Sequence, residues 1–308
     1  MDLNISPDLQ LSLVLPKGSL EKATMDLFML ADLAVHRSSP VDYHAKINDP
    51  RIKDVRILRP QEIPGYVADG LFDFGVTGSD WIEETQADVV QLGQLGYSKA
   101  TRSPVRIVLA VEQNSSVQKV TDLSDGTKIS TEYPQLTKRY LEDRGIKADI
   151  RLSYGATEAK VPDIVDAVVE ITETGRALEL AGLRIVETLR ESTTELIANP
   201  KAAESPEKFT MMNQILTLLQ GAMEARDKVL IKLNVTETDL PKVLDLLPSM
   251  KAPTVSELAR NGGYAVETVV LKADINILIP KLVELGATDI IELPISKIIS
   301  SPSLINFR

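Results

Sequence analysis

The feature that most constrains this fold is a repeated alternation between short apolar runs and segments with helical periodicity. Residues 11–15, LSLVL, form an apolar run, and the segment behind it repeats apolar residues at helical spacing. The alternation returns at VRIL near 55, at 63–68, at FDFGVT and at Ser79. Strands that alternate with helices are typical of a parallel or mixed sheet covered by helices on both faces. The N-terminal part is therefore predicted to be an α/β lobe.

A second lobe is predicted from about residue 104. PVRIVLAV and TKIST indicate strands, PQLTKRYLEDRG a helix that ends at Gly145, and AVVEIT a further strand before the turn TETG. The strands RIVET and TELIA near 184–198 are expected to return to the first lobe. We therefore predict a cleft between lobe I, formed by 1–102 and 185–206, and lobe II, formed by 103–184.

The C-terminal part is predicted to be a separate domain, residues 207–308. A polar stretch, NPKAAESPEK, leads as a linker into an amphipathic helix over about 207–226. Behind it the strand and helix patterns follow the order β-α-β-β-α-β, which is typical of a ferredoxin-like, ACT-like α+β domain. Such domains often serve as small-ligand regulatory modules, although the order of elements argues only the fold.

Composition excludes several classes of function. The 308 residues contain no cysteine, which excludes thiolate catalysis and thiolate metal sites. A net charge of -10 disfavours nucleic acid and anionic membranes as partners. The N-terminal sequence MDLNISPDLQ lacks the basic and apolar stretches of a secretory signal, and no apolar run is long enough to cross a bilayer. We expect a cytoplasmic protein whose two histidines, His36 and His44, are solvated.

A phosphate site is predicted at the junction in residues 166–183, DAVVEITETGRALELAGL. GxGxxG and Walker sequences are both missing from the chain. At 166–183 an apolar strand ends in acidic and hydroxyl residues before a glycine and a helix, where free amides and the helix dipole favour an anion. Asp166 and Glu170 on the strand could accept hydrogen bonds from ribose hydroxyls. An ordinary strand-turn-helix with Thr174 as N-cap explains the same pattern.

Other candidates follow strands at the expected carboxyl edge of the first sheet, where ligands of open α/β sheets collect. Lys17 and Gly18 follow the first strand, Arg59 follows VRIL, and Gly75 and Gly78 lie near the end of another strand. Turn chemistry or a solvated loop accounts for each of these residues equally well.

Taken together, five blocks of sequence resemble the ATP phosphoribosyltransferase family in its long form with a fused regulatory domain. They occur in family order over nearly the whole chain: LPKGSL, LRPQEIPGYVADGLFDFGVTGSDWIEE, ISTEYPQLTKRYLEDRGI, GATEAKVPDIVDAVVEITETGRALELAGLR and LPSMKAPTVSEL. The resemblance implies a core of two lobes like those of periplasmic binding proteins. It also implies transfer of the phosphoribosyl group of phosphoribosyl pyrophosphate to N1 of ATP, with Mg²⁺ present. The products are phosphoribosyl-ATP and pyrophosphate, in the first step of histidine biosynthesis.

The resemblance also assigns roles to residues. It implies catalytic roles for Lys17, Arg59 and Glu170. The positions implied for binding phosphoribosyl pyrophosphate are Asp166, Glu170, Thr172, Glu173, Thr174, Gly175, Arg176, Ala177 and Leu178. Those implied for ATP are Lys17, Gly18, Arg59 and Gly78, and no protein ligand for the metal is assigned. Ala177 stands where many members have Thr or Ser, and Glu170 where others often have Asp.

Regulation and assembly are implied in the same way. Feedback inhibition by histidine is expected at Asn234, Met250 and Thr254, for which a plain structural role is the alternative. The family implies homo-oligomers, a dimer and a hexamer. A two-lobed small-molecule binding protein without catalysis is the alternative from a different class, and a catalytically silent regulatory homologue is a third.

Overall fold

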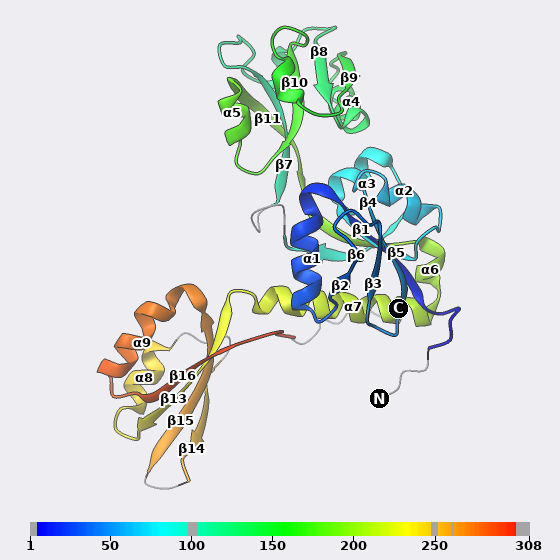
Figure 1. Cartoon of the computed structure of the whole chain (residues 1–308). Coiled ribbons are helices and arrows are strands. Elements are labelled where there is room, and N and C mark those ends of the chain that lie inside the picture. Colours follow the sequence, from blue (N-terminus) through cyan, green and yellow to red (C-terminus); the bar gives the residue numbers. More distant parts are fainter. Residues whose placement is uncertain (1–4, 98–103, 248–251, 260–261, 300–308) are drawn as a thin grey trace. The chain divides into compact units, whose positions relative to one another are not determined.

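A computed structural model describes residues 5–97, 104–247, 252–259 and 262–299 of the chain. The chain divides into two compact units, residues 1–216 and 217–308 (Figure 1). The boundary falls inside helix α7, Pro206–Ala225, rather than at its start as predicted from the sequence. In the part of the chain that the structure describes, every helix is too short or too polar to span a bilayer.

Lobe I of the first unit is built on a seven-stranded sheet with the order β2-β3-β4-β1-β5-β12-β6. Strand β1 is parallel to β4 and β5, whereas β12 is antiparallel to β5 and β6. The strands are β1 (Leu11–Pro16), β2 (Val35–His36), β3 (His44–Ile47), β4 (Ile52–Leu58), β5 (Phe74–Gly78), β6 (Val90–Leu95) and β12 (Thr194–Ala198). The helices after β1, β4 and β5 are α1 (Glu21–Leu30), α2 (Ile63–Ala68) and α3 (Ser79–Thr85).

Burial explains why lobe I adopts these elements. Every residue of β1 except Ser12 is buried, and so is the whole of β5, as expected for central strands covered on both faces. Helix α1 turns Thr24, Leu27 and Phe28, which share one helical face, into the core. The predicted strand-helix alternation of this lobe is therefore confirmed.

Lobe II contains a five-stranded sheet with the order β11-β7-β10-β8-β9. Strand β8 is parallel to β9 and β10, while β7 is antiparallel to β10 and β11. The strands are β7 (Val105–Glu112), β8 (Lys128–Thr131), β9 (Asp149–Leu152), β10 (Ala167–Thr172) and β11 (Leu183–Ser192), and the helices are α4 (Pro134–Glu142) and α5 (Arg176–Leu180).

The return to lobe I begins later than the sequence predicted, which corrects the boundary at 185. Strand β11 pairs with β7 along its length, from Leu183 opposite Glu112 to Ser192 opposite Val105. It therefore belongs to the sheet of lobe II. Only β12, which starts at Thr194, joins the first sheet. The strand pattern of 183–192 could not reveal its partner, because sheet pairing is set by contacts distant in sequence.

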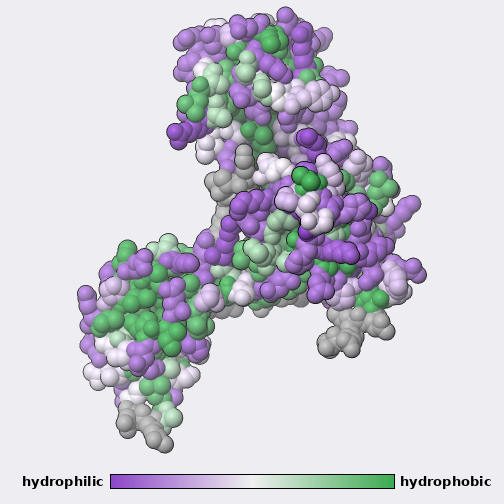
Figure 2. All heavy atoms as spheres, in the orientation of Figure 1, coloured by the Kyte–Doolittle hydropathy of each residue, from purple (hydrophilic) through white to green (hydrophobic). Residues whose placement is uncertain are grey.

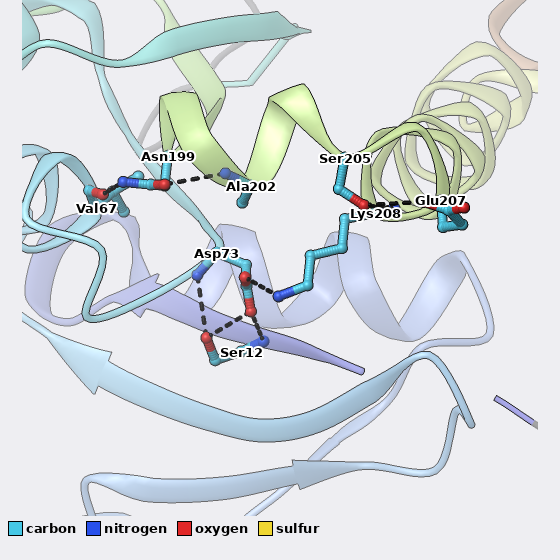
Figure 3. Close-up of polar contacts among 8 residues, drawn as sticks. All are labelled: Ser12, Val67, Asp73, Asn199, Ala202, Ser205, Glu207 and Lys208. Carbon is cyan, nitrogen blue, oxygen red and sulfur yellow. Dashed lines mark hydrogen bonds and ion pairs between the residues drawn. The ribbon is translucent and has the colours of Figure 1, made fainter. Parts of the chain in front are cut away.

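The predicted linker at 199–208 is folded against lobe I. Residues Pro200–Glu204 form α6, and Asn199 caps this helix by accepting a hydrogen bond from the amide of Ala202 at 3.0 Å. The Asn199 side chain also donates to the carbonyl of Val67 at 2.9 Å (Figure 3). Asn199 therefore makes specific contacts with lobe I, while Lys201, Glu204 and Glu207 of the same stretch are exposed.

An ion pair fixes the beginning of α7 to the first sheet. Lys208 Nζ lies 2.7 Å from Asp73 Oδ1, and both side chains are largely buried. The other oxygen of Asp73 accepts hydrogen bonds from the amide and the hydroxyl of Ser12 in β1, at 2.7 and 2.9 Å (Figure 3). Helix α7 thus starts at a defined point on lobe I.

The C-terminal unit has the predicted ferredoxin-like topology. Its four-stranded sheet has the order β14-β15-β13-β16, with all neighbours antiparallel. The elements are β13 (Lys228–Thr236), α8 (Leu240–Leu246), β14 (Thr254–Glu257), β15 (Gly263–Leu271), α9 (Ile275–Glu284) and β16 (Thr288–Pro294). Core residues of both helices, such as Val243 and Leu282, pack on one face of the sheet against Ile231 and Val266.

Candidate active site

A cavity of about 370 Å³ lies between the two lobes of the first unit. Lobe I lines it with Gln61, Gly78 and Trp81, among others. Lobe II contributes Glu132 and the loop residues 172–174. The cleft expected from the sequence is therefore present, and it lies where strands of both sheets end.

A second cavity, of about 360 Å³, adjoins the first. It is lined by Lys17, Gly18, Tyr43 and Arg59. Three further residues line both cavities: Ser19, Pro60 and Gln61. The two cavities thus form neighbouring compartments, one framed by both lobes and one by the loops of lobe I.

Strand pairing explains why the lobe I candidates meet. Strands β1 and β4 are parallel with Pro16 opposite Leu58, so that Lys17 and Arg59 each follow a strand at the same edge. The Lys17 amide donates to the carbonyl of Leu58 at 2.7 Å, which ties the two loops together. Lys17 Nζ lies 3.9 Å from the centre of the Tyr43 ring, a cation–π contact that holds the ammonium over this compartment.

The loop after β10 has the geometry of a phosphate cradle. The amide of Gly175 donates to Thr172 Oγ1 at 2.8 Å, which folds the loop back on itself. Gly175 has a φ of 82°, a left-handed conformation that favours glycine, and it precedes α5. Thr172, Thr174 and Ala177 face the first cavity, so its wall carries hydroxyls and the start of a helix.

Two carboxylates of lobe II near the cleft, Glu170 and Glu132, have shifted pKa values. Burial raises the pKa of Glu170, against a hydrogen bond from Thr157 that lowers it. Burial also raises the pKa of Glu132, while the positive charges of Arg59 and Lys160 lower it. Positive charges from both lobes thus act on Glu132. Cations of lobe I next to carboxylates of lobe II suit a ligand that carries phosphates and hydroxyls.

Some predicted residues do not reach the cavities. Asp166 precedes β10 and accepts a hydrogen bond from the amide of Lys128 at 2.8 Å, roughly 20 Å of strand away from Thr172. Its predicted contact with the ribose is therefore corrected to a structural role. Leu178 is buried in the core with Val168, and so cannot present its side chain to a ligand. Arg176 is exposed at the start of α5 and lies outside the cavity lining.

Gly78 lines the first cavity, and packing also requires a glycine at this position. A Cβ at this position would lie 2.0 Å from the Asp80 carboxylate, which folds back over the end of β5. Any side chain would displace that carboxylate. The residue predicted to contact ATP therefore serves a packing role at the same place.

Sequence reasoning missed Glu132 and Lys160. Both lie in blocks that were recognised, and Glu132 directly follows the end of β8, so the rule applied to β1 and β4 would have found it. Lys160 donates from Nζ to Ser153 Oγ at 2.6 Å and lies between the buried hydroxyls of Ser130 and Ser153. No local pattern distinguishes this lysine, because its neighbours Ser130 and Ser153 come from two other segments of the chain.

The three residues expected to bind histidine are only partly described. Asn234 in β13 and Thr254 in β14 lie on the same face of the sheet, opposite the two helices, because β15 pairs with both strands. The Asn234 amide donates to Asp289 Oδ2 at 3.0 Å. Met250 lies outside the described residues.

Family models match most of the chain. Residues 59–221 match the model described as ATP phosphoribosyltransferase, and residues 225–297 match the C-terminal domain of the same family. The junction between the two matches falls in the last turn of α7, close to the boundary between the two compact units.

Relatives and solved structures agree with the family models. An ATP phosphoribosyltransferase of Pelotomaculum thermopropionicum is 44% identical over 94% of this chain and 100% of its own length. That of Chlorobium phaeovibrioides is 45% identical over 94% of this chain and 97% of its own length. Among solved structures, the ATP phosphoribosyl transferase (HisG:HisZ) complex from Thermotoga maritima matches with a TM-score of 0.58. That match has 24% identity and covers 68% of this chain and 99% of the other.

Proposed function

This chain belongs to the ATP phosphoribosyltransferase family, and from that premise we propose how its two cavities carry out the family reaction. The chain is a transferase that moves the phosphoribosyl group of phosphoribosyl pyrophosphate to N1 of ATP. The products are phosphoribosyl-ATP and pyrophosphate, and the reaction is the first step of histidine biosynthesis. Lobes I and II form the catalytic part, and the ferredoxin-like unit forms the regulatory part.

We place phosphoribosyl pyrophosphate on the lobe II wall of the first cavity. The 5-phosphate would lie against the loop 172–177, which lines the cavity with Thr172, Thr174 and Ala177 at the start of α5. Glu170 precedes this loop on β10 and would accept hydrogen bonds from the ribose hydroxyls. The observation that carries this assignment is that the loop residues and Gly78 of lobe I line one cavity.

We place the phosphates of ATP in the second cavity, between Lys17 and Arg59. Both side chains are cationic and line the same compartment. Because this compartment adjoins the first cavity through Gln61, an adenine that extends from it would reach the cleft between the lobes. This arrangement brings N1 of the adenine towards C1 of the ribose.

The proposed mechanism requires positioning and charge stabilisation. Adenine N1 is unprotonated at neutral pH, so that attack on C1 needs no base to generate the nucleophile. As the new N–C bond forms, the bond from C1 to the pyrophosphate oxygen breaks and negative charge develops on the leaving group. Arg59, with Lys17 beside it, would stabilise that charge by hydrogen bonds that strengthen in the transition state.

Mg²⁺ is proposed as the metal of the reaction, bound mainly through the substrate. Among the described residues, no group of three or more histidine, aspartate or glutamate side chains could hold a metal ion. Mg²⁺ commonly binds through substrate phosphates and one or two carboxylates. Glu132 and Glu173 line the first cavity and could supply such a carboxylate. Bound there, the metal would neutralise part of the charge of the pyrophosphate.

The proposal extends to regulation, assembly and location. We propose that histidine inhibits by binding the C-terminal unit near Asn234 and Thr254. We also propose a cytoplasmic location and a homo-oligomer. The oligomer is supported by the apolar residues that gather on the visible face of this unit (Figure 2) and by the large apolar side chains exposed on it. Those that keep more than a third of their surface exposed include Ile277, Val283, Ile291 and Leu293.

Substrate protection of backbone amides tests the proposed sites. Phosphoribosyl pyrophosphate with Mg²⁺ should slow hydrogen exchange in 172–177, whereas ATP should slow it in 17–20 and 59–61. The segment 149–152, which forms the edge strand β9, serves as the control and should not respond. Protection by phosphoribosyl pyrophosphate that leaves 172–177 unchanged would remove this loop from the site.

A further inference from the structure

The first cavity contains a buried carboxylate that none of the proposed chemical roles uses. Asp80, in the first turn of α3, is 2% exposed. It accepts hydrogen bonds from the hydroxyl of Tyr133 at 2.8 Å and from that of Ser192 at 2.7 Å. Tyr133 lies between β8 and α4 of lobe II, and Ser192 ends β11, where the chain returns to lobe I. One carboxylate thus joins three segments of the catalytic unit.

A second carboxylate of α3 makes a matching contact. Glu84 accepts hydrogen bonds from the backbone amides of Gln135 and Leu136 at 3.0 and 2.8 Å. These amides belong to the first turn of α4, where amides have no partner within their own helix. Because Asp80 and Glu84 are four residues apart, they project from one face of α3, and both bind lobe II.

Aromatic packing strengthens the same contact. The rings of Trp81 and Tyr133 stack with their centres 4.5 Å apart. Trp81 is a residue of α3, yet it packs into the core cluster of lobe II together with Ile107 and Leu136. Arg139 of α4 adds a hydrogen bond to the carbonyl of Glu83 at 2.5 Å.

Separating the lobes on this side would be unfavourable. It would leave Asp80 and Glu84 without the donors that compensate for their burial, and it would expose the two stacked rings. Burial raises the pKa of Asp80, although the hydrogen bonds from Ser192 and Tyr133 lower it. The contact should therefore persist when no substrate is bound.

The contact also fixes the loop that carries Glu132. Tyr133 is the next residue, and its amide donates to Thr131 Oγ1 at 2.9 Å, so that the loop is held on both sides of Glu132. Glu132 lines the first cavity, and the positive charges of Arg59 and Lys160 lower its pKa against the effect of burial.

We propose that Asp80 and Glu84 form a clasp that holds the loop 131–136 of lobe II against α3 in the substrate-free protein, and that this clasp positions Glu132 in the cavity for phosphoribosyl transfer. Asp80, Glu84 and Tyr133 are then positioning residues that act through Glu132. The second half of the proposal rests on the proposed function, whereas the first half concerns the free protein alone.

Hydrogen exchange of the full chain without substrate tests the clasp. The amides of Gln135 and Leu136 should exchange slowly in the wild type, and at least about tenfold faster in Glu84→Gln, which replaces the charged acceptor. Rapid exchange of these two amides in the wild-type protein would overturn the clasp. This measurement does not depend on any activity.

Kinetics of Tyr133→Phe test the positioning of Glu132. The variant keeps the ring on Trp81 but removes the hydrogen bond to Asp80, and we expect kcat/KM for both substrates to fall by about tenfold or more. The matched control is Tyr140→Phe, which removes a hydroxyl that binds Glu187 at 3.2 Å outside both cavities. The control should stay within about twofold of the wild type.

A double variant separates positioning from a merely structural effect. If Tyr133 acts through Glu132, adding Tyr133→Phe to Glu132→Gln should lower kcat/KM no further than Glu132→Gln alone. Losses that simply multiply would overturn the positioning role, and so would full activity of Glu132→Gln. A wild-type chain that releases no pyrophosphate would instead contradict the proposed function, and the exchange experiment would still decide the clasp.

Discussion

At the scale of single residues, Lys17 and Arg59 are the cations on which the proposed site depends. Each is expected to make charge-assisted hydrogen bonds to substrate oxygens, which are worth about 1.5–3 kcal/mol, or about ten- to a hundredfold in rate. Either alanine substitution should therefore lower kcat/KM at least about tenfold. Lys53→Ala, which changes an exposed lysine on β4, is the control and should leave the kinetics unchanged. If both Lys17→Ala and Arg59→Ala match this control, the two residues are only solvated loop cations.

The pair of Asp73 and Lys208 gives a prediction for stability against pH. Burial alone would raise the pKa of Asp73, but hydrogen bonds from Lys208 and Ser12 outweigh it and bring the pKa below its usual value. The folded protein therefore binds this proton more weakly than the unfolded chain. The pair stabilises the fold above the usual aspartate pKa of about 4, and the contribution is lost as the pH falls through the lower folded value.

Lys208→Met should remove this contribution. The largely buried carboxylate would lose its charged partner, and the free energy of unfolding near neutral pH should fall by about 1–3 kcal/mol. The loss of stability on acidification should also become smaller. Denaturant unfolding between pH 3 and 7 would measure both effects. Lys22→Met, in an exposed pair with Asp26, should behave like the wild type, and an equal loss in that control would contradict the account.

At the scale of elements, the loop between β10 and α5 gives the next prediction. Gly175 has a φ of 82°, and a Cβ there would lie 3.2 Å from Ile185 Cδ1. Gly175→Ala should therefore disturb the cradle and raise the KM for phosphoribosyl pyrophosphate. Gly182→Ala is a matched control, because Gly182 has a φ of 76° and open space around it. Both variants should lose about 1 kcal/mol of stability, but only the first should change the KM. Equal KM values in the two variants would exclude the loop from the site.

The elements show which parts of the fold a sequence can predict. The strand at 11–15 and the helix at 63–68 were predictable because their signals are local: a buried apolar run, and a helix with proline in its first turn. The sheet that β11 joins was not predictable, because its pairing with β7 joins residues far apart in the sequence.

The same distinction holds for the site. The strand-end rule predicted that Lys17 and Arg59 lie close together, since parallel strands end at a common edge, and both line one cavity. The strand-turn-helix pattern predicted the loop 172–177, but it also included Asp166, which lies at the opposite end of β10 from that loop. Neither signal could find the contact between Asp80 and Tyr133, which joins two lobes across 53 positions in the sequence.

At the scale of the whole molecule, the proposed regulation predicts that histidine acts through the C-terminal unit. Coupling between separate sites is typically worth about 1–3 kcal/mol, and two states that differ in affinity are required. Thr254→Ala should therefore raise the histidine concentration needed for half-inhibition about fivefold or more, with substrate kinetics unchanged. Lys281→Ala on α9, which covers the opposite face of the sheet, is the control.

The kinetic type of histidine inhibition distinguishes binding to the C-terminal unit from binding in the substrate cleft. Histidine bound to the C-terminal unit should still inhibit at saturating ATP and phosphoribosyl pyrophosphate. Inhibition that competes with either substrate and is unchanged in Thr254→Ala would show that histidine binds in the cleft.

Release of pyrophosphate by the purified full chain is the most direct measurement of the central claim, which is that the chain transfers a phosphoribosyl group. With Mg²⁺, ATP and phosphoribosyl pyrophosphate, the account predicts repeated turnover that requires both substrates. One phosphoribosyl-ATP, identified by its mass, should form for each pyrophosphate released. Binding of either substrate without pyrophosphate release would contradict the account and indicate a two-lobed binding protein without catalysis.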